Sequence, residues 1–324
     1  MGGIIGMGNA LVDILVTLDN EDFLNDLGIA KGSMQLVDLS FSNRVLGKVI
    51  ELPQTVVSGG SASNTIHGLS KMGVTSAFIG KISDDQYGSI FRQDLEKNGI
   101  TPKLFSEPPC TGRAVALITP DSERTFATYL GSAVNLCADE ITGELFKGYD
   151  LFHIEGYLVQ NHELLEKALF TAKQEGLTVS LDLASFNIVE ENLEFLQKVT
   201  GKFVDILFAN EEEASVFTGL KAEEAVVAMG QKCPVSIVKT GAEGSLVFSG
   251  GNTVKVSSIK ALPVDTTGAG DLYASGFLFG MINDLSFEKC GMIGSLLAGR
   301  VIEQVGAKIP EQKWDDILKA VRGI

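Results

Sequence analysis

The stretch Asp265-Thr266-Thr267-Gly268-Ala269-Gly270-Asp271 runs without a break into a long apolar segment, residues 272–281. Gly268 and Gly270 have no side chains, so we expect the backbone N–H groups of the first helical turn to be uncovered. Those groups have no partner inside a helix and lie at the positive end of its dipole, which suits them to bind phosphate or an oxyanion. The stretch therefore predicts a turn from extended chain into a helix, with an anion cradle at the turn.

Asp271 falls in the same first turn of this predicted helix. A carboxylate repels a phosphate bound beside it, so its placement makes sense where it accepts a proton from an attacking hydroxyl. The alternative is structural: Thr266 or Thr267 caps the helix and Asp271 complements the helix dipole. The stretch alone favours the structural alternative, so other segments must decide.

The composition is that of an ordinary globular protein. The chain has 324 residues, 45% of them hydrophobic, which is enough for a substantial core in one large domain or in one domain with an appendage. Acidic residues outnumber basic residues 41 to 26, and the net charge of −15 disfavours nucleic acid and anionic membranes as partners. No apolar run is long enough to span a membrane, and the 4 cysteines are isolated in sequence, so we expect a cytoplasmic protein.

Polar residues follow a buried strand that the apolar run at residues 3–8 predicts. Asn9 and Asp13 would lie at the carboxyl end of this strand, where ligands gather in open α/β sheets. They are candidates for hydrogen bonds to a polyol, although a turn at the strand end explains them equally well. A second exposed helix start, Gly59-Gly60, precedes a helix that runs to about residue 72, and Asn64 lies one turn into it.

Short strands alternate with helical stretches from residue 150 onward, which predicts a parallel sheet with right-handed crossovers. Before that point, β-rich segments at about residues 14–57 and 100–130 predict a small additional β element. Arg124 lies in the second segment. An arginine in a β segment is usually a solvated edge residue, and a phosphate contact is the alternative if the segment folds over a site.

Two further motifs follow predicted strands near the middle of the chain. Asn210 and Glu213 are three residues apart and share a helix face, so they offer an amide oxygen and a carboxylate to Mg²⁺, directly or through water. The alternative is a helix N-cap with acidic first-turn residues. The loop at residues 239–244 contains Gly241 and Gly244, and it predicts either a nucleotide site or a hairpin turn.

All of these groups fall where strands end and helices begin, and together they suit phosphoryl transfer to a hydroxyl. Such catalysis is mostly positioning and neutralisation of negative charge, which a cation and helix N–H groups supply while one carboxylate accepts the proton. The chain contains neither a Walker A sequence nor a protein-kinase signature.

The sequence resembles the ribokinase-like, or PfkB, family of carbohydrate and nucleoside kinases. Three segments carry the resemblance in order: Gly59-Gly60 to Asn64, Asn210 to Glu213, and Asp265 to Asp271. The resemblance implies a three-layer α/β/α sandwich with a central, mostly parallel sheet and a small β-sheet lid. It also implies one domain over residues 1–324, with the lid formed by two insertions at about 12–57 and 100–130.

The resemblance also implies roles for individual residues. The general base would be Asp271, with an anion hole made of Gly268, Ala269 and Gly270. The acceptor's hydroxyls would be held by Asn9, Asp13, Gly59, Gly60 and Asn64. ATP would be bound by Thr240, Gly241, Gly244 and Arg124, and Mg²⁺ by Asn210 and Glu213. Potassium often binds beside the anion hole in this family, and its candidate side-chain ligands here are Asp265 and Thr267.

Within the family, the segments at residues 8–14, 128–131 and 155–158 look most like bacterial adenosine kinases. Adenosine is therefore the leading acceptor, and the lid residues Met34, Gln35 and Tyr129 are candidates to contact its base. A kinase for ribose, fructose or another sugar is the first alternative, and a nucleoside-binding protein without catalysis is the second. The sequence is compatible with either a monomer or a homodimer.

One position departs from the family pattern. Many relatives have an asparagine at the end of the strand that begins near Thr178, and this chain has Asp182 there.

Overall fold

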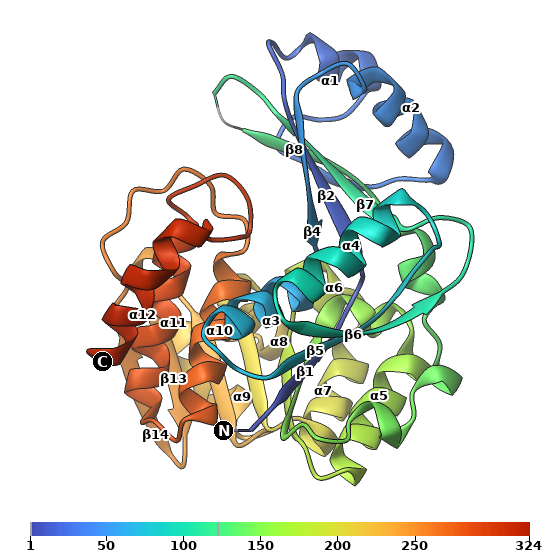
Figure 1. Ribbon diagram of the computed structural model, residues 1–324. Helices are drawn as coiled ribbons and strands as arrows, with labels where there is room; N and C mark the ends of the chain where they lie inside the picture. The colour runs from blue at the N-terminus through green and yellow to red at the C-terminus, as the bar shows by residue number, and fades with distance from the viewer. Residues whose placement is uncertain (1, 122) are drawn as a thin grey trace.

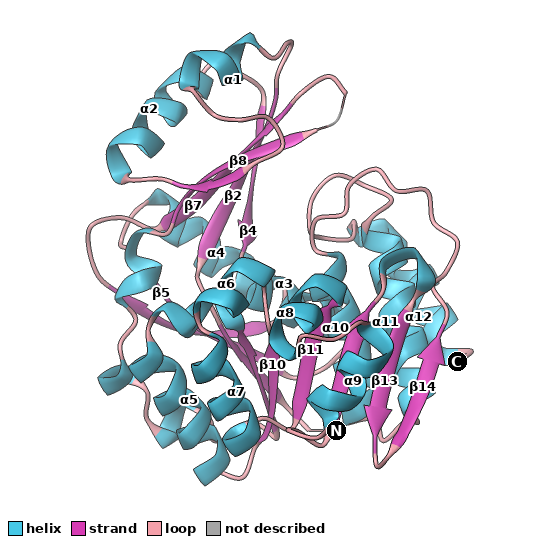
Figure 2. Cartoon of the chain, turned by 180° about the vertical axis from the view of Figure 1, so that it is seen from behind, coloured by secondary structure: helices cyan, strands magenta, loops and turns pink. Residues whose placement is uncertain are grey.

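Two β-sheets of unequal size organise the chain (Figure 1; Figure 2). The computed structural model describes residues 2–121 and 123–324. The larger sheet has nine strands in the order β14-β13-β12-β11-β10-β9-β1-β5-β6. Its strands are β1 (Ile4–Met7), β5 (Ser76–Ile82), β6 (Ile100–Ser106), β9 (Leu151–Glu155), β10 (Thr178–Asp182), β11 (Ile206–Asn210), β12 (Val235–Lys239), β13 (Ser245–Ser249) and β14 (Asn252–Val256).

The larger sheet is parallel from β6 to β12, and β13 and β14 add an antiparallel edge. The mostly parallel sheet predicted from the strand–helix alternation is confirmed. Because parallel strands share one direction, the polar residues that end β10, β11 and β12 gather at the same edge of the sheet as Asn9, which follows β1.

Helices cover both faces of this sheet, so the three-layer prediction is confirmed. One face carries α3 (Ser61–Lys71), α4 (Gln86–Lys97), α10 (Ala269–Ile282), α11 (Phe287–Val301) and α12 (Trp314–Arg322). The other carries α5 (His162–Gln174), α6 (Phe186–Glu191), α7 (Leu193–Phe203), α8 (Glu211–Thr218) and α9 (Ala222–Gly230). Neighbouring strand residues such as Ile4 and Ile5 belong to opposite cores, as the two-residue period of a strand requires.

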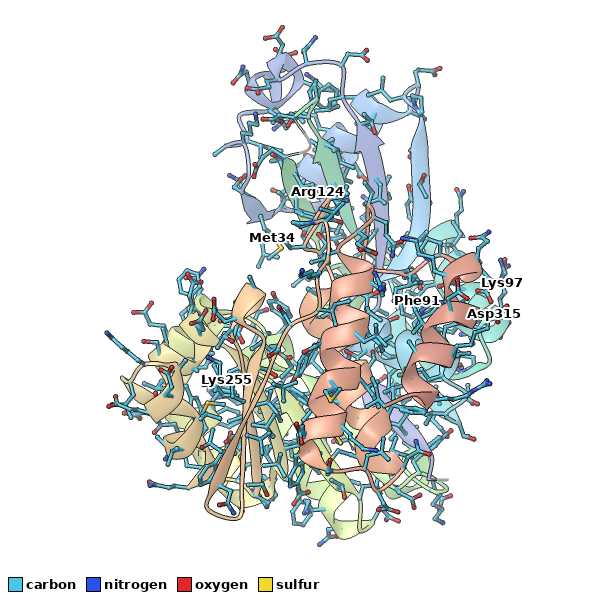
Figure 3. All side chains as sticks on the ribbon, turned by 90° about the vertical axis from the view of Figure 1, so that its left-hand side faces the viewer. Met34, Phe91, Lys97, Arg124, Lys255 and Asp315 are labelled. Carbon is cyan, nitrogen blue, oxygen red and sulfur yellow. The ribbon has the colours of Figure 1, made fainter. Side chains whose placement is uncertain are left out.

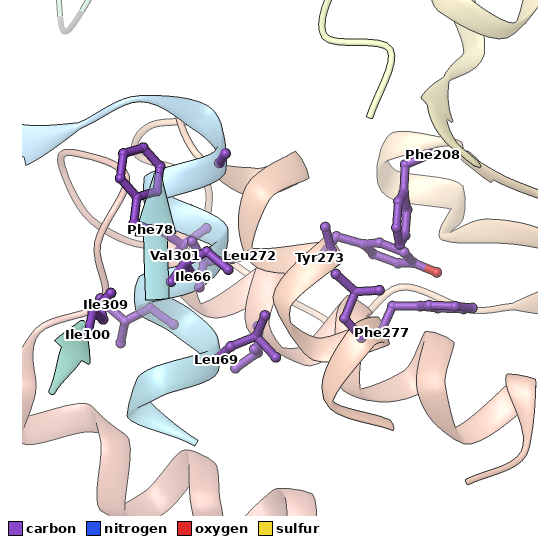
Figure 4. Close-up of a cluster of buried hydrophobic side chains, with 14 of the residues drawn as sticks. Ile66, Leu69, Phe78, Ile100, Phe208, Leu272, Tyr273, Phe277, Val301 and Ile309 are labelled. Carbon is purple, nitrogen blue, oxygen red and sulfur yellow. The ribbon is translucent and has the colours of Figure 1, made fainter. Parts of the chain in front are cut away.

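Helices α3 and α10 pack closely where both begin near the same edge of the sheet. Ile66 and Leu69 of α3 lie against Leu272 of α10 in the buried cluster of Figure 4. The Ser275 hydroxyl of α10 donates to the Thr65 carbonyl of α3 at 2.8 Å. These contacts fix the start of α10 relative to the start of α3.

The smaller sheet forms a lid above that edge. Its five strands follow the order β3-β8-β7-β2-β4. They span β2 (Leu11–Thr17), β3 (Met34–Leu36), β4 (Gln54–Gly59), β7 (Gly112–Ile118) and β8 (Arg124–Tyr129), and α1 (Asp22–Leu27) and α2 (Leu39–Val49) cover the face away from the main sheet (Figure 1). The second lid segment therefore starts at β7 and not near residue 100, because β6 pairs with β5 in the main sheet.

The chain enters the lid twice: it first passes from β1 to β2 and returns from β4 to α3, and it later passes from β6 to β7 and returns from β8 to β9. The first two crossings, near Asn9 and Gly60, touch. Gly60 has a φ of +92°, and a Cβ atom there would lie 2.3 Å from the Asn9 carbonyl oxygen, so only glycine fits. Among the described residues, no helix combines the length and the apolar character needed to cross a membrane.

The close packing of α3 on α10 gives a first prediction. A Cβ atom on Gly68 would lie 2.5 Å from the Ser275 Oγ and 2.9 Å from Leu272 Cδ1. We expect Gly68→Ala to lower the free energy of unfolding by about 1–3 kcal/mol, since overpacking forces the helices apart. The control is Gly201→Ala in α7, where a Cβ meets no atom within 4 Å and helix propensity should add up to ~1 kcal/mol. Urea unfolding measures both, and equal midpoints would contradict the prediction.

Candidate active site

Asp271 lies in the first turn of α10 and is held from two sides. The Ser61 hydroxyl donates to its Oδ1 at 2.7 Å, and the Asn64 amide donates to its Oδ2 at 3.0 Å. Both donors come from the first turn of α3, so the close packing of the two helices sets the direction of the carboxylate. Ser61 was not predicted from the sequence as a site residue.

The environment of Asp271 makes it a better base than an ordinary aspartate. Burial raises its pKa to about 6, and the negative charge of Asp182 adds to the rise. The hydrogen bonds from Asn64 and Ser61 and the charge of Lys239 act in the opposite direction. A carboxylate with a pKa near 6 is ionised at neutral pH and holds a proton more firmly than one with a pKa of 3.8.

The turn before α10 has the geometry of an anion cradle. Gly268 is the N-cap residue with a φ of +77°, and α10 begins at Ala269. The N–H of Ala269 is bonded to the Thr266 carbonyl, whereas the N–H groups of Gly270 and Asp271 have no partner among the described residues. Two uncovered N–H groups at a helix start, next to a carboxylate, are the arrangement expected for holding a phosphoryl oxygen beside a base.

Glu155 connects the amino-terminal strand to α3. It ends β9, is 1% exposed, and accepts hydrogen bonds at Oε1 from the Asn9 backbone and side-chain amides at 2.8 and 2.9 Å. Its Oε2 accepts from the backbone N–H of Ala62 at 2.9 Å. Burial raises the pKa of Glu155 to about 7. Glu155 therefore fixes Asn9 beside the start of α3. The sequence includes Glu155 in the segment 155–158 that resembles adenosine kinases, but it does not indicate this role.

Asp13 points from β2 into the space between lid and sheet. Its carboxylate lies over Gly59, where a Cβ atom would be 2.3 Å from Oδ1. Burial raises the pKa of Asp13 to about 7, and the positive charge of Lys308 opposes this. No side chain or backbone N–H among the described residues donates to the Asp13 carboxylate, and the buried Asn64 Oδ1 likewise has no partner there. Asn9, Asp13, Gly59, Gly60 and Asn64 thus lie around one space.

Two lid residues expected to contact the acceptor lie on the wrong face. Tyr129 packs beside Arg113, whose guanidinium carbon is 5.7 Å from the ring centre, and Arg113 donates to Ser42 of α2 at 2.8 Å. Gln35 pairs in register with Ala127, a core residue of the same helix-covered face. The predictions for Gln35 and Tyr129 are therefore corrected.

The opposite face of the lid sheet, directed at the main sheet, follows from the two-residue period of β3 and β8. It carries Met34 and Leu36, which are 61% and 63% exposed, and Phe126, which pairs with Met34. Arg124 lies on this face too, and Figure 3 shows Met34 and Arg124 beneath the lid.

Arg124 reaches from the lid to the loop before the anion cradle. Its Nη2 makes an ion pair with Asp265 Oδ2 at 2.7 Å, without the geometry of a hydrogen bond, and its Nη1 donates to the Thr267 hydroxyl at 3.1 Å. The side chain is 8% exposed, so the expectation of a solvated edge residue is wrong.

Asp265 and Thr267 use their oxygens within the protein. Asp265 Oδ1 accepts from the Thr267 backbone and hydroxyl, and Oδ2 accepts from the Gly306 N–H at 2.7 Å and faces Arg124. The Thr267 hydroxyl donates to Asp265 and accepts from Arg124. These side chains do not fit the potassium ligands expected from the sequence, because proton donors already surround them.

Asn210 and Glu213 form a reciprocal cap at the start of α8. The Asn210 Oδ1 accepts from the Glu213 N–H at 2.8 Å, and the Glu213 carboxylate accepts from the Asn210 backbone and side-chain amides at 2.8 and 2.7 Å. This is the capping arrangement considered as the alternative from the sequence. Each carboxylate oxygen keeps a free lone pair, and burial raises the pKa of Glu213 to about 7.

Lys239 ends β12 directly opposite Asn210 in the sheet register. Its ammonium makes an ion pair with Asp182 Oδ2 at 2.7 Å. The loop that follows is tight: the Thr240 N–H donates to the Gly244 carbonyl at 2.9 Å, and Gly244 has a φ of +104°. Gly241, with a φ of +55°, has open space at its Cβ position. The predicted ATP-binding loop therefore begins beside the Asp182–Lys239 pair.

Comparisons with known proteins agree with this arrangement. The family model described as pfkB family carbohydrate kinase matches residues 40–314. The crystal structure of adenosine kinase from Sinorhizobium meliloti is 32% identical with a TM-score of 0.87, over 99% of each chain. A probable sugar kinase from Rhizobium etli is also 32% identical, with a TM-score of 0.89 over 100% of this chain and 99% of the other. Adenosine kinase 2 of Arabidopsis thaliana is 26% identical over 96% of each chain.

The family match extends over most of the chain and contains the starts of α3, α8 and α10, where the carboxylate, the cap and the anion cradle lie. The chain is therefore a member of the pfkB family of carbohydrate kinases, phosphotransferases that act on an alcohol group.

Proposed function

We propose that this kinase transfers the γ-phosphate of ATP to a hydroxymethyl group of a nucleoside, with adenosine as acceptor and Asp271 as general base. The observation that carries the proposal is the desolvated Asp271 carboxylate beside the uncovered N–H groups of Gly270 and Asp271. An acceptor hydroxyl within reach of that carboxylate would also face a phosphoryl group held in the cradle. Proton removal and charge stabilisation then occur at one point.

The acceptor would be held on the amino-terminal side of the site. The Asp13 carboxylate and the Asn64 Oδ1 have no donors of their own, so they can accept hydrogen bonds from sugar hydroxyls. Asn9 is kept in place by Glu155. These two hydrogen-bond acceptors have fixed directions, so they would orient the hydroxymethyl group of the substrate toward Asp271. Such orientation lowers the entropic part of the reaction barrier.

Space for a group larger than a sugar supports a nucleoside. A hollow of about 560 Å³ adjoins Asn9 and Tyr157, and its wall includes Ala133, Val134, Leu158, Gln160 and His162. This wall mixes apolar and amide side chains, as a pocket for a heterocyclic base does. A sugar acceptor remains the second candidate, because one of the matched structures is that of a probable sugar kinase.

ATP would lie across the carboxyl ends of β11 and β12, with its phosphates directed at the cradle. Thr240, Gly241 and Gly244 supply a tight loop there, and Arg124 brings a positive charge from the lid. Asn210 and Glu213 fit Mg²⁺ held through water, since Glu213 keeps free lone pairs and Mg²⁺ in kinases keeps several waters. When bound, Mg²⁺ supplies neutralisation of the phosphate charge.

Potassium dependence stays a prediction. The side chains of Asp265 and Thr267 are committed to protein donors, so a monovalent cation at this loop would have to use backbone oxygens.

The test of the proposed function is ADP release from Mg-ATP with adenosine, inosine, ribose and fructose in parallel. We expect turnover with adenosine, and we expect Asp271→Asn to lower kcat by about 10²- to 10⁴-fold, the usual contribution of a general base. Asp315→Asn on the surface of α12 is the matched control and should keep wild-type activity. Turnover with a sugar but not with adenosine would show that the substrate is a sugar, and the assignment of Asp271 as the base would stand. Binding of adenosine without ADP release would contradict the kinase proposal.

The raised pKa of Asp271 predicts the pH dependence. The base works only when ionised, so kcat/KM should fall as pH drops below about 6 and level off above 7. Because the charge of Asp182 raises the pKa of Asp271, Asp182→Asn should move the acid limb of the profile, where kcat/KM falls, to lower pH. Initial rates between pH 5 and 9 measure both profiles, and a limb that stays in place in the variant would contradict the assigned coupling.

The two faces of the lid sheet predict opposite effects of two substitutions. Phe126 faces the main sheet, whereas Tyr129 faces Arg113 and α2. We expect Phe126→Ala to raise the KM for the acceptor about 10-fold, because one good aromatic contact contributes up to about 1.5 kcal/mol and about 1.4 kcal/mol is a factor of ten. Tyr129→Phe should leave that KM within a factor of two. A larger effect at Tyr129 than at Phe126 would show that the lid register is misassigned.

A further inference from the structure

Lys239 places a positive charge at the anion cradle. A Cβ atom built on Gly270 would lie 3.1 Å from the Lys239 Nζ, closer than any other atom outside the cradle. The ammonium therefore lies alongside the first turn of α10, next to one of the two uncovered N–H groups. A cation at the positive end of a helix dipole is unfavourable by itself, and the Asp182 carboxylate offsets this while the site is empty.

Only part of the hydrogen-bonding capacity of Lys239 is used. An ammonium has three N–H donors. Within residues 2–121 and 123–324, the single acceptor bonded to Nζ is Asp182 Oδ2, at 2.7 Å. The Lys239 side chain is 15% exposed and the Asp182 side chain is 9% exposed, so the pair is mostly buried but still partly accessible.

The surroundings of Lys239 are acidic. Asp182, Glu213 and Asp271 all act on it electrostatically, and they end or follow β10, β11 and the anion cradle. An incoming polyphosphate would be repelled by these three carboxylates. Lys239 is the cation that ends a strand among them, and its Nζ lies between Asp182 and Gly270 of the cradle.

We infer that Lys239 is a phosphate-binding residue of the kinase reaction, donating to the oxygens of the phosphoryl group that the cradle holds. Asp182 keeps the ammonium in position and balances its charge while the site is empty. The inference rests on the proposed ATP-dependent function. It assigns to one lysine the task that a charge-assisted donor performs in a desolvated phosphate site.

A simpler account is that Lys239 only neutralises Asp182. A double-mutant cycle separates the two accounts, because Asp182→Asn/Lys239→Met removes both charges and leaves neither unpaired. If Lys239 binds phosphate, Lys239→Met and the double variant both bind nucleotide more weakly, while thermal stability recovers in the double variant. If Lys239 only neutralises Asp182, the double variant recovers affinity as well.

The measurement is titration calorimetry of the protein with the Mg²⁺ complex of a non-hydrolysable ATP analogue, with no acceptor present. Steady-state kinetics follow. We expect both Lys239 variants to lose about 10-fold or more in affinity and about 100-fold in kcat/KM for ATP, the usual cost of one transition-state donor, while KM for the acceptor changes little. Lys255→Met on the exposed edge strand β14, labelled in Figure 3, removes the same charge and should change neither value.

Wild-type affinity in the double variant would overturn the inference, and so would a wild-type protein that binds no nucleotide. Because the calorimetry needs no acceptor, it distinguishes this failure from a wrong acceptor. A protein that binds the analogue through Lys239 but turns over none of the acceptors supports the inference and refutes the proposed function.

Discussion

The contact between the starts of α3 and α10 is the constraint on which the site depends. Two hydrogen bonds from α3, donated by Ser61 and Asn64, determine where the Asp271 carboxylate points. They are possible because Gly68 lets the helices approach until the Ser275 hydroxyl bonds the backbone of α3. The Asp271 carboxylate is therefore positioned by helix packing, which is more rigid than a loop.

Electrostatics in the site follow from the same burial. Asp13, Glu155, Glu213 and Asp271 are carboxylates whose pKa values burial raises to between about 6 and 7. Several desolvated carboxylates destabilise a folded chain, because ionising each of them costs more inside than in water. These carboxylates lie near the carboxyl ends of the main-sheet strands. Three cations oppose the rise in their pKa values: Lys239 acts on Glu213 and Asp271, and Lys308 and Arg124 act on Asp13.

Much of the fold and the position of the site could be predicted from the sequence, because strand–helix alternation and glycine-exposed helix starts are local signals. The sequence does not show which face of the lid sheet a residue lies on. Gln35 and Tyr129 lie on the face opposite to the one predicted, and which face is covered depends on where α2 packs. The sequence places Lys239 and Glu155 in segments of interest, residues 239–244 and 155–158, but it indicates no role for either, because a single charged residue at a strand end has no spacing that points to one. Their importance arises only from neighbours more than fifty residues away, Asp182 and Asn9.

The first pair of crossings between the main sheet and the lid has a mechanical consequence. Asn9 on the way in and Gly59-Gly60 on the way out lie around the same space that the Asp13 carboxylate faces. A change in the angle between the lid and the main sheet would therefore alter the contacts around this space. A molecule that filled the space would restrain the lid.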